Sequence, residues 1–217
     1  MPTRRRTMKK CNGKLLETVA WSVAGVVLCS ALVYYNFVDK PTVVEESLIG
    51  KACPEVSVEY IALEGGVYEM SEQKFTLSEN KGKITILNFW DTWCVPCVKE
   101  LPEFNEFKAA YSEVDIIAIV PKRPDVITWM NGKGYQTFTP DVLWTDFSIS
   151  FAMYDAEQED LYAKLGGKGA LPMTVVVDRN GVVIYQTEGS MHYEDLQEVV
   201  LPLLENADEA TDDSSQE

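Results

Sequence analysis

The most constraining feature of this sequence is a pair of cysteines, Cys94 and Cys97, at the junction of two differently patterned segments. Residues 84–90 form a mostly apolar run without regular alternation, which is typical of a β-strand covered on both faces. After Cys97, apolar residues recur with helical spacing, and Pro96 suits the first turn of a helix, where its missing N–H is not needed. The positive end of the helix dipole stabilises a thiolate there and lowers its pKa. The pair therefore predicts a dithiol–disulfide redox centre.

The small number of other cysteines and histidines argues against a metal site at this motif. A tetrahedral zinc site needs four ligands, normally Cys or His. Beyond residue 40, only Cys53 and His192 could join the pair, and one histidine gives little support to a Ser-His-Asp or Cys-His hydrolase. We therefore expect no metal, and no cofactor other than the redox-active Cys94–Cys97 disulfide. Cys53 is interpreted as a buried small apolar residue, and His192 as a surface residue.

The charge distribution separates the N-terminus from the rest of the chain. The net charge is −15, yet residues 1–40 hold seven basic and two acidic residues, which leaves 12 basic and 32 acidic residues in the remainder. Nucleic-acid binding needs a basic face for phosphate contacts. We therefore exclude nucleic acid as a partner of the acidic domain.

The N-terminal segment has the pattern of a membrane anchor. Residues 1–18 are basic, and residues 19–38 are twenty residues without a charge, enough for a helix to span a bilayer. The positive-inside bias places the N-terminus in the cytoplasm and the domain outside the cell membrane, as a single-pass protein of bacterial type. The alternative is a cleavable signal peptide, cut near the small residues 29–31. Because the apolar run continues past Ala31, an uncleaved anchor is favoured.

The remainder predicts a short linker at 39–47, one folded domain at 48–205 and an acidic, disordered tail at 206–217. An Asn-Gly pair at 180–181 is typical of a hairpin turn, and Pro102 is expected to kink the helix that contains it. Strands alternate with helices, which predicts an α/β sandwich with a mixed sheet. We expect strands at 56–62 (an edge strand), 67–70, 84–90, 116–120, 175–178 and 182–187, and helices after Cys97 and at 126–130, 157–165 and 194–204.

Several short motifs in this order resemble the thioredoxin superfamily, and within it the membrane-anchored thiol–disulfide oxidoreductases of the TlpA/ResA type. They are GKACP at 50–54, LNFW at 87–90, WCVPC at 93–97, ELP at 100–102, LPMT at 171–174 and DRNG at 178–181. The resemblance extends from about residue 48 to residue 205. It implies a thioredoxin-like three-layer sandwich with a mixed central sheet.

The resemblance also implies roles in catalysis. Cys94 would attack a substrate disulfide, and Cys97 would resolve the mixed disulfide that results. Glu100 matches an acidic residue that some relatives keep near the dithiol, one helical turn after Cys97. With a raised pKa it could accept the proton of the Cys97 thiol. The alternative is a solvated acidic residue in the first turn, where the helix dipole favours it.

Residues around the cysteine pair are expected to hold the substrate. Pro172 matches the family's cis-proline, which lies beside the cysteines and supports a substrate backbone. We assign Trp93, Pro96, Leu171 and Pro172 to this substrate-binding surface. Asn88 is expected to face the interior near the cysteines, as a buried amide.

Asp91 departs from the pattern, because relatives commonly have a small neutral residue there. A carboxylate three residues before Cys94 would oppose thiolate formation if the two groups lie close. This charge would bias the centre weakly towards a reductant.

The leading interpretation is a membrane-tethered protein-disulfide reductase that acts outside the cytoplasm. The family suggests protein thiol or disulfide substrates, with apocytochrome c and cytochrome c maturation as one case, and a thiol-reducing electron donor in the membrane. The first alternative is a net disulfide oxidase or isomerase that uses the same residues. A thiol peroxidase and a non-catalytic client-binding module are further alternatives.

Overall fold

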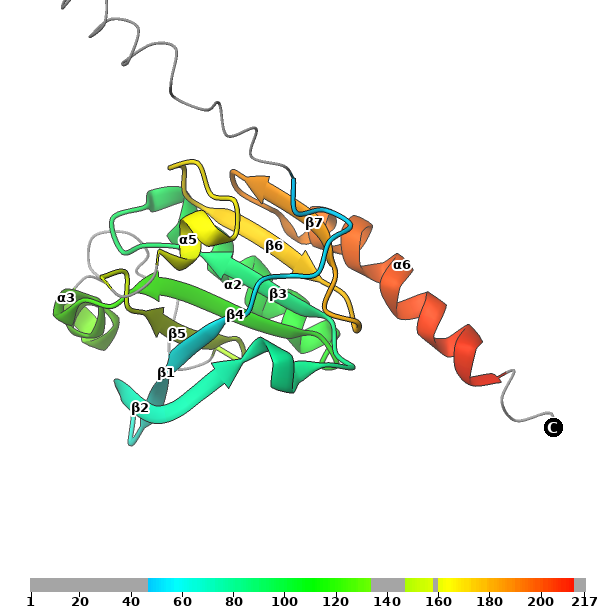
Figure 1. Cartoon of the computed structure of the whole chain (residues 1–217). Helices are drawn as coiled ribbons and strands as arrows, with labels where there is room; N and C mark the ends of the chain where they lie inside the picture. Colours follow the sequence, from blue (N-terminus) through cyan, green and yellow to red (C-terminus); the bar gives the residue numbers. More distant parts are fainter. Residues whose placement is uncertain (1–46, 134–146, 158–159, 213–217) are drawn as a thin grey trace, which may run out of the picture. The chain divides into compact units, whose positions relative to one another are not determined.

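The computed structural model describes residues 47–133, 147–157 and 160–212 of the chain (Figure 1). Among these residues, seven strands form one mixed sheet in the order β2-β1-β5-β4-β3-β6-β7. The strands are β1 (Ser57–Glu64), β2 (Val67–Thr76), β3 (Thr85–Phe89), β4 (Asp115–Pro121), β5 (Ser150–Tyr154), β6 (Met173–Val177) and β7 (Val183–Glu188). The helices are η1 (Leu77–Asn80), α2 (Val95–Ala110), α3 (Pro124–Thr128), η2 (Trp129–Lys133), α5 (Leu161–Lys164) and α6 (Tyr193–Asp212).

β3 lies in the interior of the sheet, as its unbroken apolar pattern predicts. It pairs in parallel with β4 and antiparallel with β6, and each of its five residues is buried. Because β4 runs parallel to β3, the carboxyl ends of both strands meet at one edge of the sheet. α2 begins just beyond this edge, after Cys94, and α3 begins there after Arg123.

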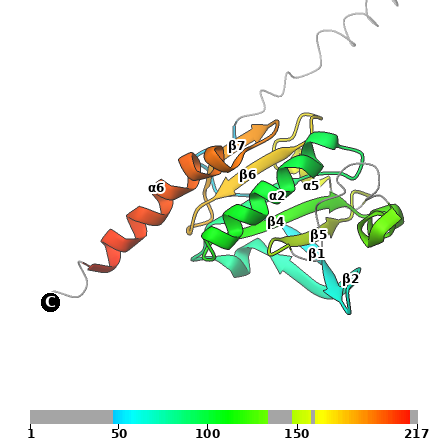
Figure 2. The same cartoon turned by 180° about the vertical axis from the view of Figure 1, so that it is seen from behind.

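Helices cover both faces of the sheet. α2 and α6 lie on one face, and α5 lies on the other, as the two opposite views show (Figures 1 and 2). The alternation of buried side chains follows this arrangement: Ile86 and Ala118 belong to the cluster that contains Phe104 of α2, whereas Leu87 belongs to the cluster that contains Leu161 of α5. This layering and the mixed sheet agree with the predicted α/β sandwich.

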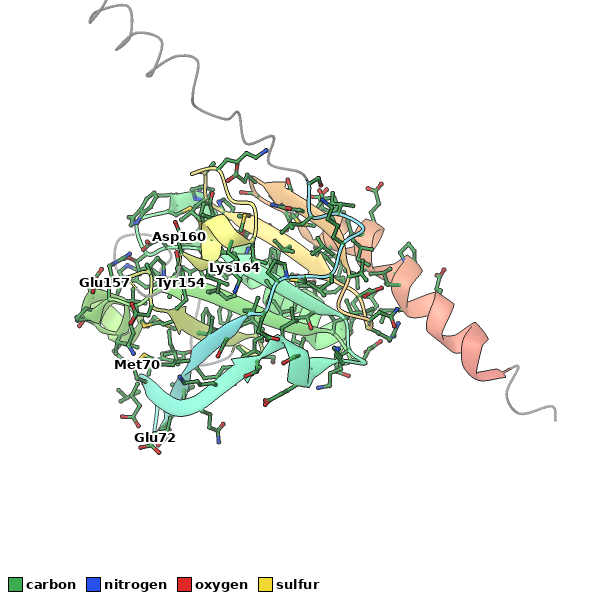
Figure 3. All side chains as sticks on the ribbon, viewed as in Figure 1. Met70, Glu72, Tyr154, Glu157, Asp160 and Lys164 are labelled. Carbon is green, nitrogen blue, oxygen red and sulfur yellow. A yellow bond between two sulfur atoms is a disulfide. The ribbon has the colours of Figure 1, made fainter. Side chains whose placement is uncertain are left out.

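α5 is short, and its first turn is closed by a side chain. Asp160 accepts a hydrogen bond from the Ala163 backbone N–H at 3.1 Å, which is the usual way to satisfy an N–H that has no intrahelical partner. At the other end, the Lys164 ammonium donates to the Glu55 carbonyl at 2.9 Å. Figure 3 shows Asp160 and Lys164 on this helix. The sequence predicts a longer helix over 157–165, and the structure shortens it to four residues.

Three further expectations differ from the structure. The strand expected at the edge, β1, instead lies inside the sheet. It pairs with β2 on one side and with β5 on the other. The sequence analysis does not foresee β5. Finally, α6 continues to Asp212, whereas the sequence predicts the last helix over 194–204.

The expectations for residues 1–18, for the anchor at 19–38 and for most of the linker lie outside the described residues. Within the described part of the chain, no helix has both the length and the apolar composition needed to cross a bilayer.

Candidate active site

The two cysteines lie at the start of α2, which follows β3 in the chain, and a disulfide joins them. Cys94 is the N-cap residue of α2, and its sulfur accepts a hydrogen bond from the Cys97 backbone N–H at 3.3 Å. Pro96 occupies the first turn of the helix, as predicted. Cys97 is fully buried, whereas Cys94 keeps a small exposed area. Cys94 is therefore the more exposed residue of the two, and its role as the attacking thiolate stays a prediction.

The surface next to Cys94 is apolar. Trp93 is 65% exposed and Val95 is 39% exposed, and Pro96 is exposed as well. Large exposed apolar side chains are unusual on a soluble domain unless they contact a partner. The three side chains flank the buried Cys94 in sequence, so they offer an apolar contact surface beside the reactive sulfur.

The peptide bond between Leu171 and Pro172 is cis, as the family resemblance implied. β3 and β6 are paired with Phe89 opposite Met173, so Pro172 lies just beyond the end of this pairing, beside Trp90 and the cysteine loop. Pro172 is buried, and its carbonyl accepts a hydrogen bond from the Gly189 N–H at 2.8 Å. The Leu171–Pro172 turn is thereby fixed to the residue that follows β7.

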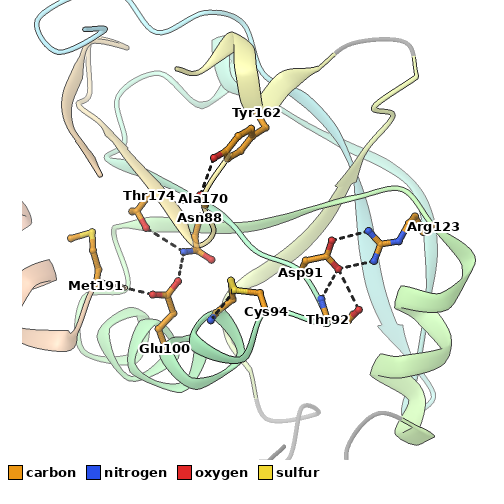
Figure 4. Close-up of a disulfide and its surroundings, with 11 residues drawn as sticks. Asn88, Asp91, Thr92, Cys94, Glu100, Arg123, Tyr162, Ala170, Thr174 and Met191 are labelled. Carbon is orange, nitrogen blue, oxygen red and sulfur yellow. Dashed lines mark hydrogen bonds and ion pairs between the residues drawn. A yellow bond between two sulfur atoms is a disulfide. The ribbon is translucent and has the colours of Figure 1, made fainter. Parts of the chain in front are cut away.

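Two side chains that the sequence analysis does not single out, Tyr162 and Glu188, hold the loop that precedes Leu171. The Glu188 carboxylate accepts hydrogen bonds from the Tyr162 hydroxyl and from the Lys168 N–H, the latter at 2.6 Å. The Tyr162 oxygen in turn accepts from the Gly169 N–H at 2.9 Å and lies 2.8 Å from the Ala170 carbonyl (Figure 4). A single tyrosine–carboxylate pair thus fixes three successive residues of the loop.

Glu100 is buried on α2, one turn after Cys97. Its side chain is 1% exposed; one carboxylate oxygen accepts from the Asn88 amide at 2.8 Å, and the other accepts from the Met191 N–H at 3.1 Å (Figure 4). Burial raises the pKa of Glu100 to about 7, although the two hydrogen bonds act in the opposite direction. The alternative of a solvated residue in the first turn is therefore wrong.

The Asn88 amide can serve both ionisation states of Glu100. Asn88 is fully buried, as expected, and its NH₂ group also donates to the Thr174 hydroxyl at 3.2 Å. Its carbonyl oxygen has no hydrogen-bond partner among the described residues. A reversed amide would place this oxygen towards both Glu100 and Thr174. It could then accept the proton of a neutral Glu100, while the hydroxyl of Thr174 turns to donate.

Asp91 is 3% exposed, and a guanidinium compensates its charge. Arg123 donates to both carboxylate oxygens, at 2.7 and 2.6 Å (Figure 4). A third donor is the Thr92 N–H at 2.7 Å. Burial acts to raise the pKa of Asp91, but the hydrogen bonds and the charge of Arg123 outweigh it, so the pKa is lowered. The sequence did not reveal this partner, and the weak bias towards a reductant expected from Asp91 stays a prediction.

The other titratable candidates have no place in the redox centre. Cys53 is a partly buried free thiol, and burial raises its pKa to about 12, which leaves it protonated and unreactive. His192 is exposed, and its ring nitrogen lies 3.0 Å from a Glu103 carboxylate oxygen. Within the described residues, no group of three or more His, Cys, Asp or Glu side chains is arranged to hold a metal ion.

Comparison with known proteins agrees with this geometry. The family model described as Redoxin matches residues 49–200. The thiol-disulfide oxidoreductase ResA of Bacillus thuringiensis subsp. konkukian is 31% identical over 175 residues, which are 80% of this chain and 88% of that protein. The thiol:disulfide interchange protein DsbE of Vibrio cholerae is 32% identical over 198 residues, which are 89% of this chain and 95% of that protein.

Solved structures share the fold at lower identity. A structure described as a DsbE from Chlorobium tepidum aligns with a TM-score of 0.54 and 21% identity, over 72% of this chain and 97% of that chain. A 2-Cys peroxiredoxin from Plasmodium vivax aligns with a TM-score of 0.58 and 13% identity, over 74% and 99% of the two chains. These likenesses establish a thioredoxin-like α/β fold with a mixed seven-stranded sheet across the described residues.

Proposed function

Because this chain belongs to the Redoxin family and is a thiol–disulfide oxidoreductase of the ResA/DsbE type, we propose that it reduces protein disulfides outside the cytoplasm while tethered to a membrane. The observation that carries the proposed exchange reaction is Glu100, a buried carboxyl with a pKa of about 7 placed one turn after Cys97. A reductase must release the proton of its buried resolving thiol, and this carboxyl can take it.

The reaction uses two electrons and balances without a cofactor. The Cys94 thiolate of the reduced protein attacks one sulfur of a substrate disulfide; a mixed disulfide forms, and the first substrate thiolate leaves and takes up a proton. Cys97 then gives its proton to Glu100, and its thiolate attacks the Cys94 sulfur. The Cys94–Cys97 disulfide forms, and the second substrate thiolate leaves and is protonated. The substrate is reduced to two thiols, and the protein is oxidised.

The oxidised protein must be reduced again by a dithiol donor. Tethering supports this step, because a donor held in the same membrane meets the dithiol at a raised effective concentration. The apolar, uncharged run at 19–38 after a basic segment supports such a tether, with the domain on the outer side. ResA and DsbE relatives suggest exported thiol proteins as substrates, and apocytochrome c is the case that we propose to test first.

Trapping tests the exchange chemistry directly. The Cys97→Ala variant of the full chain should accumulate a mixed disulfide through Cys94, visible as a reducible adduct on a non-reducing gel, and the adduct identifies the partner. The Cys94→Ala/Cys97→Ala variant is the control, because it keeps Cys11, Cys29 and Cys53. Adducts of equal yield in both variants would show that another cysteine is responsible, and would refute the assignment of Cys94.

Equilibration with glutathione tests the direction. A reductase should have a potential well below that of a strong oxidant such as DsbA, about −120 mV. A value near −120 mV would favour a net oxidase or isomerase that uses the same residues, and would overturn the proposed reductase.

A further inference from the structure

The ion pair between Asp91 and Arg123 has no role in the exchange reaction described above. Asp91 follows Trp90 directly, and its backbone carbonyl accepts a hydrogen bond from the Cys94 N–H at 3.0 Å. The residue that carries the charge therefore belongs to the same turn that presents the reactive sulfur.

The pair is built for strong coupling. Both oxygens of the carboxylate face both terminal nitrogens of the guanidinium, at 2.6 and 2.7 Å, and such two-point pairs are stronger and more directional than single contacts. The Asp91 side chain is 4% exposed, and that of Arg123 is 33% exposed, so water screens the interaction only in part.

The fold brings the two residues together from different strands. Asp91 lies beyond the end of β3, and Arg123 lies beyond the end of β4, which runs parallel to β3. The Trp90 N–H donates to the Ile119 carbonyl of β4 at 3.0 Å, which fixes the spacing of the two strand ends. Arg123 is also the N-cap residue of α3.

We propose that Arg123 is a positioning residue that tunes the redox centre: by pairing with Asp91 it cancels the charge on the turn that carries Cys94, and so sets the redox potential of the Cys94–Cys97 pair. This inference rests on the dithiol exchange chemistry and not on the proposed direction of electron flow. It assigns a function to the carboxylate by which this chain departs from its family.

The sign of the effect follows from the charge of the reduced state. A stabilised thiolate favours the dithiol form, and this makes the potential less negative. An unpaired carboxylate near the sulfur would destabilise the thiolate, whereas an unpaired guanidinium would stabilise it. Among the described residues, the other titratable groups that interact with the pair are Asp125 of α3 and Tyr154 of β5. Both are unchanged in the Asp91 and Arg123 variants compared below, and the Asp125→Asn control tests the first of them separately.

The test compares the Asp91→Asn and Asp91→Asn/Arg123→Gln variants of the full chain with the unchanged chain. Asn keeps an oxygen that can accept from the Thr92 N–H, but it removes the buried partner of Arg123 and leaves this cation paired only with the exposed Asp125, because a guanidinium stays charged. The equilibrium with glutathione should shift at least about tenfold towards the dithiol, which is about 30 mV for a two-electron couple. Replacing Arg123 as well should return the equilibrium to within about threefold of the unchanged chain.

Asp125→Asn is the matched control. Asp125 also pairs with Arg123, at 3.2 Å, but its side chain is exposed and it does not belong to the cysteine turn. Its loss should leave the equilibrium unchanged. No shift in Asp91→Asn, a shift that persists when Arg123 is also replaced, or an equal shift in Asp125→Asn would each overturn the proposal.

Thiol reactivity gives a second readout that a purely structural role would not move. The rate of alkylation of Cys94 by iodoacetamide, followed against pH, should have its midpoint about one pH unit lower in Asp91→Asn. The Arg123→Lys variant provides a second comparison if the double variant does not fold. Lys keeps the positive charge at position 123 but cannot make the two-point contact with Asp91. Its midpoint should stay with that of the unchanged chain, and a midpoint in Arg123→Lys that moves as far as in Asp91→Asn would contradict a charge effect.

Discussion

Replacing Glu100 by Gln tests whether a buried, protonatable carboxyl lies beside the dithiol. The folded pKa of Glu100 is raised from 4.5 to about 7, so the native state holds this proton more tightly than the unfolded chain. Its contribution to stability is therefore complete below about pH 4.5 and is lost as the pH rises to about 7. A shift of this size corresponds to about 3 kcal/mol. The unfolding free energy of Glu100→Gln minus that of the unchanged chain should rise by about 3 kcal/mol from pH 4.5 to pH 8.

Urea unfolding of the oxidised protein at four or five pH values measures this difference. In the disulfide form Cys94 and Cys97 do not titrate, and the titration of groups that do not interact with Glu100 cancels between the two variants. The Gln side chain fits the site, because a reversed Asn88 amide can accept from it. A difference that stays constant within about 1 kcal/mol across this range would refute the raised pKa of Glu100.

Glu103→Gln is the control for lost charge alone. Glu103 lies one turn further along α2, is only partly buried, and contacts His192 and the Tyr193 N–H. If its pH-dependent difference equals that of Glu100→Gln, burial of Glu100 is not the cause.

Three further predictions concern the surface and loop around the cysteines. Glu188→Gln replaces the carboxylate that accepts hydrogen bonds from the loop before Pro172, so KM for a protein disulfide should rise about fivefold while kcat changes less than twofold. A loss in kcat as large as the rise in KM would contradict a role in binding alone. Gly167→Ala places a Cβ at 2.4 Å from the Tyr162 ring, and thermal or urea unfolding should show a loss of about 1–3 kcal/mol. Trp93→Ala should change stability by less than about 0.5 kcal/mol because the ring is exposed, but it should slow reduction of a protein disulfide more than that of a small aromatic disulfide.

The redox motif and its immediate frame could be predicted because a short stretch of sequence encodes them. Residues 84–97 contain a buried strand, a capping position and a helix start in unbroken order, and the structure places β3, Cys94 and α2 accordingly. The interior position of β3 followed from its lack of alternation. Asn88 was expected to face the interior near the cysteines, and it is fully buried.

The partners of the site could not be predicted, because they come from distant parts of the chain. Arg123 meets Asp91 across 32 residues, and Tyr162 meets Glu188 across 26. No local pattern distinguishes these side chains from ordinary surface residues until the sheet order is known. The same limit explains β1: its alternation indicated one exposed face, but only pairing with β2 and β5 decides whether a strand lies at an edge.

The pKa values of the two buried carboxylates near the cysteine pair, Asp91 and Glu100, are shifted in opposite directions. Asp91 has a lowered pKa because Arg123 pairs with it, so it stays charged at neutral pH and cannot carry a proton. Glu100 meets only neutral donors among its hydrogen-bond partners, and its pKa is raised to about 7. Pairs of acids whose environments push their pKa values apart commonly divide into a fixed charge and a proton carrier. In the mechanism that we propose, the proton of Cys97 leaves towards Glu100, while Asp91 and Arg123 act on Cys94 through charge.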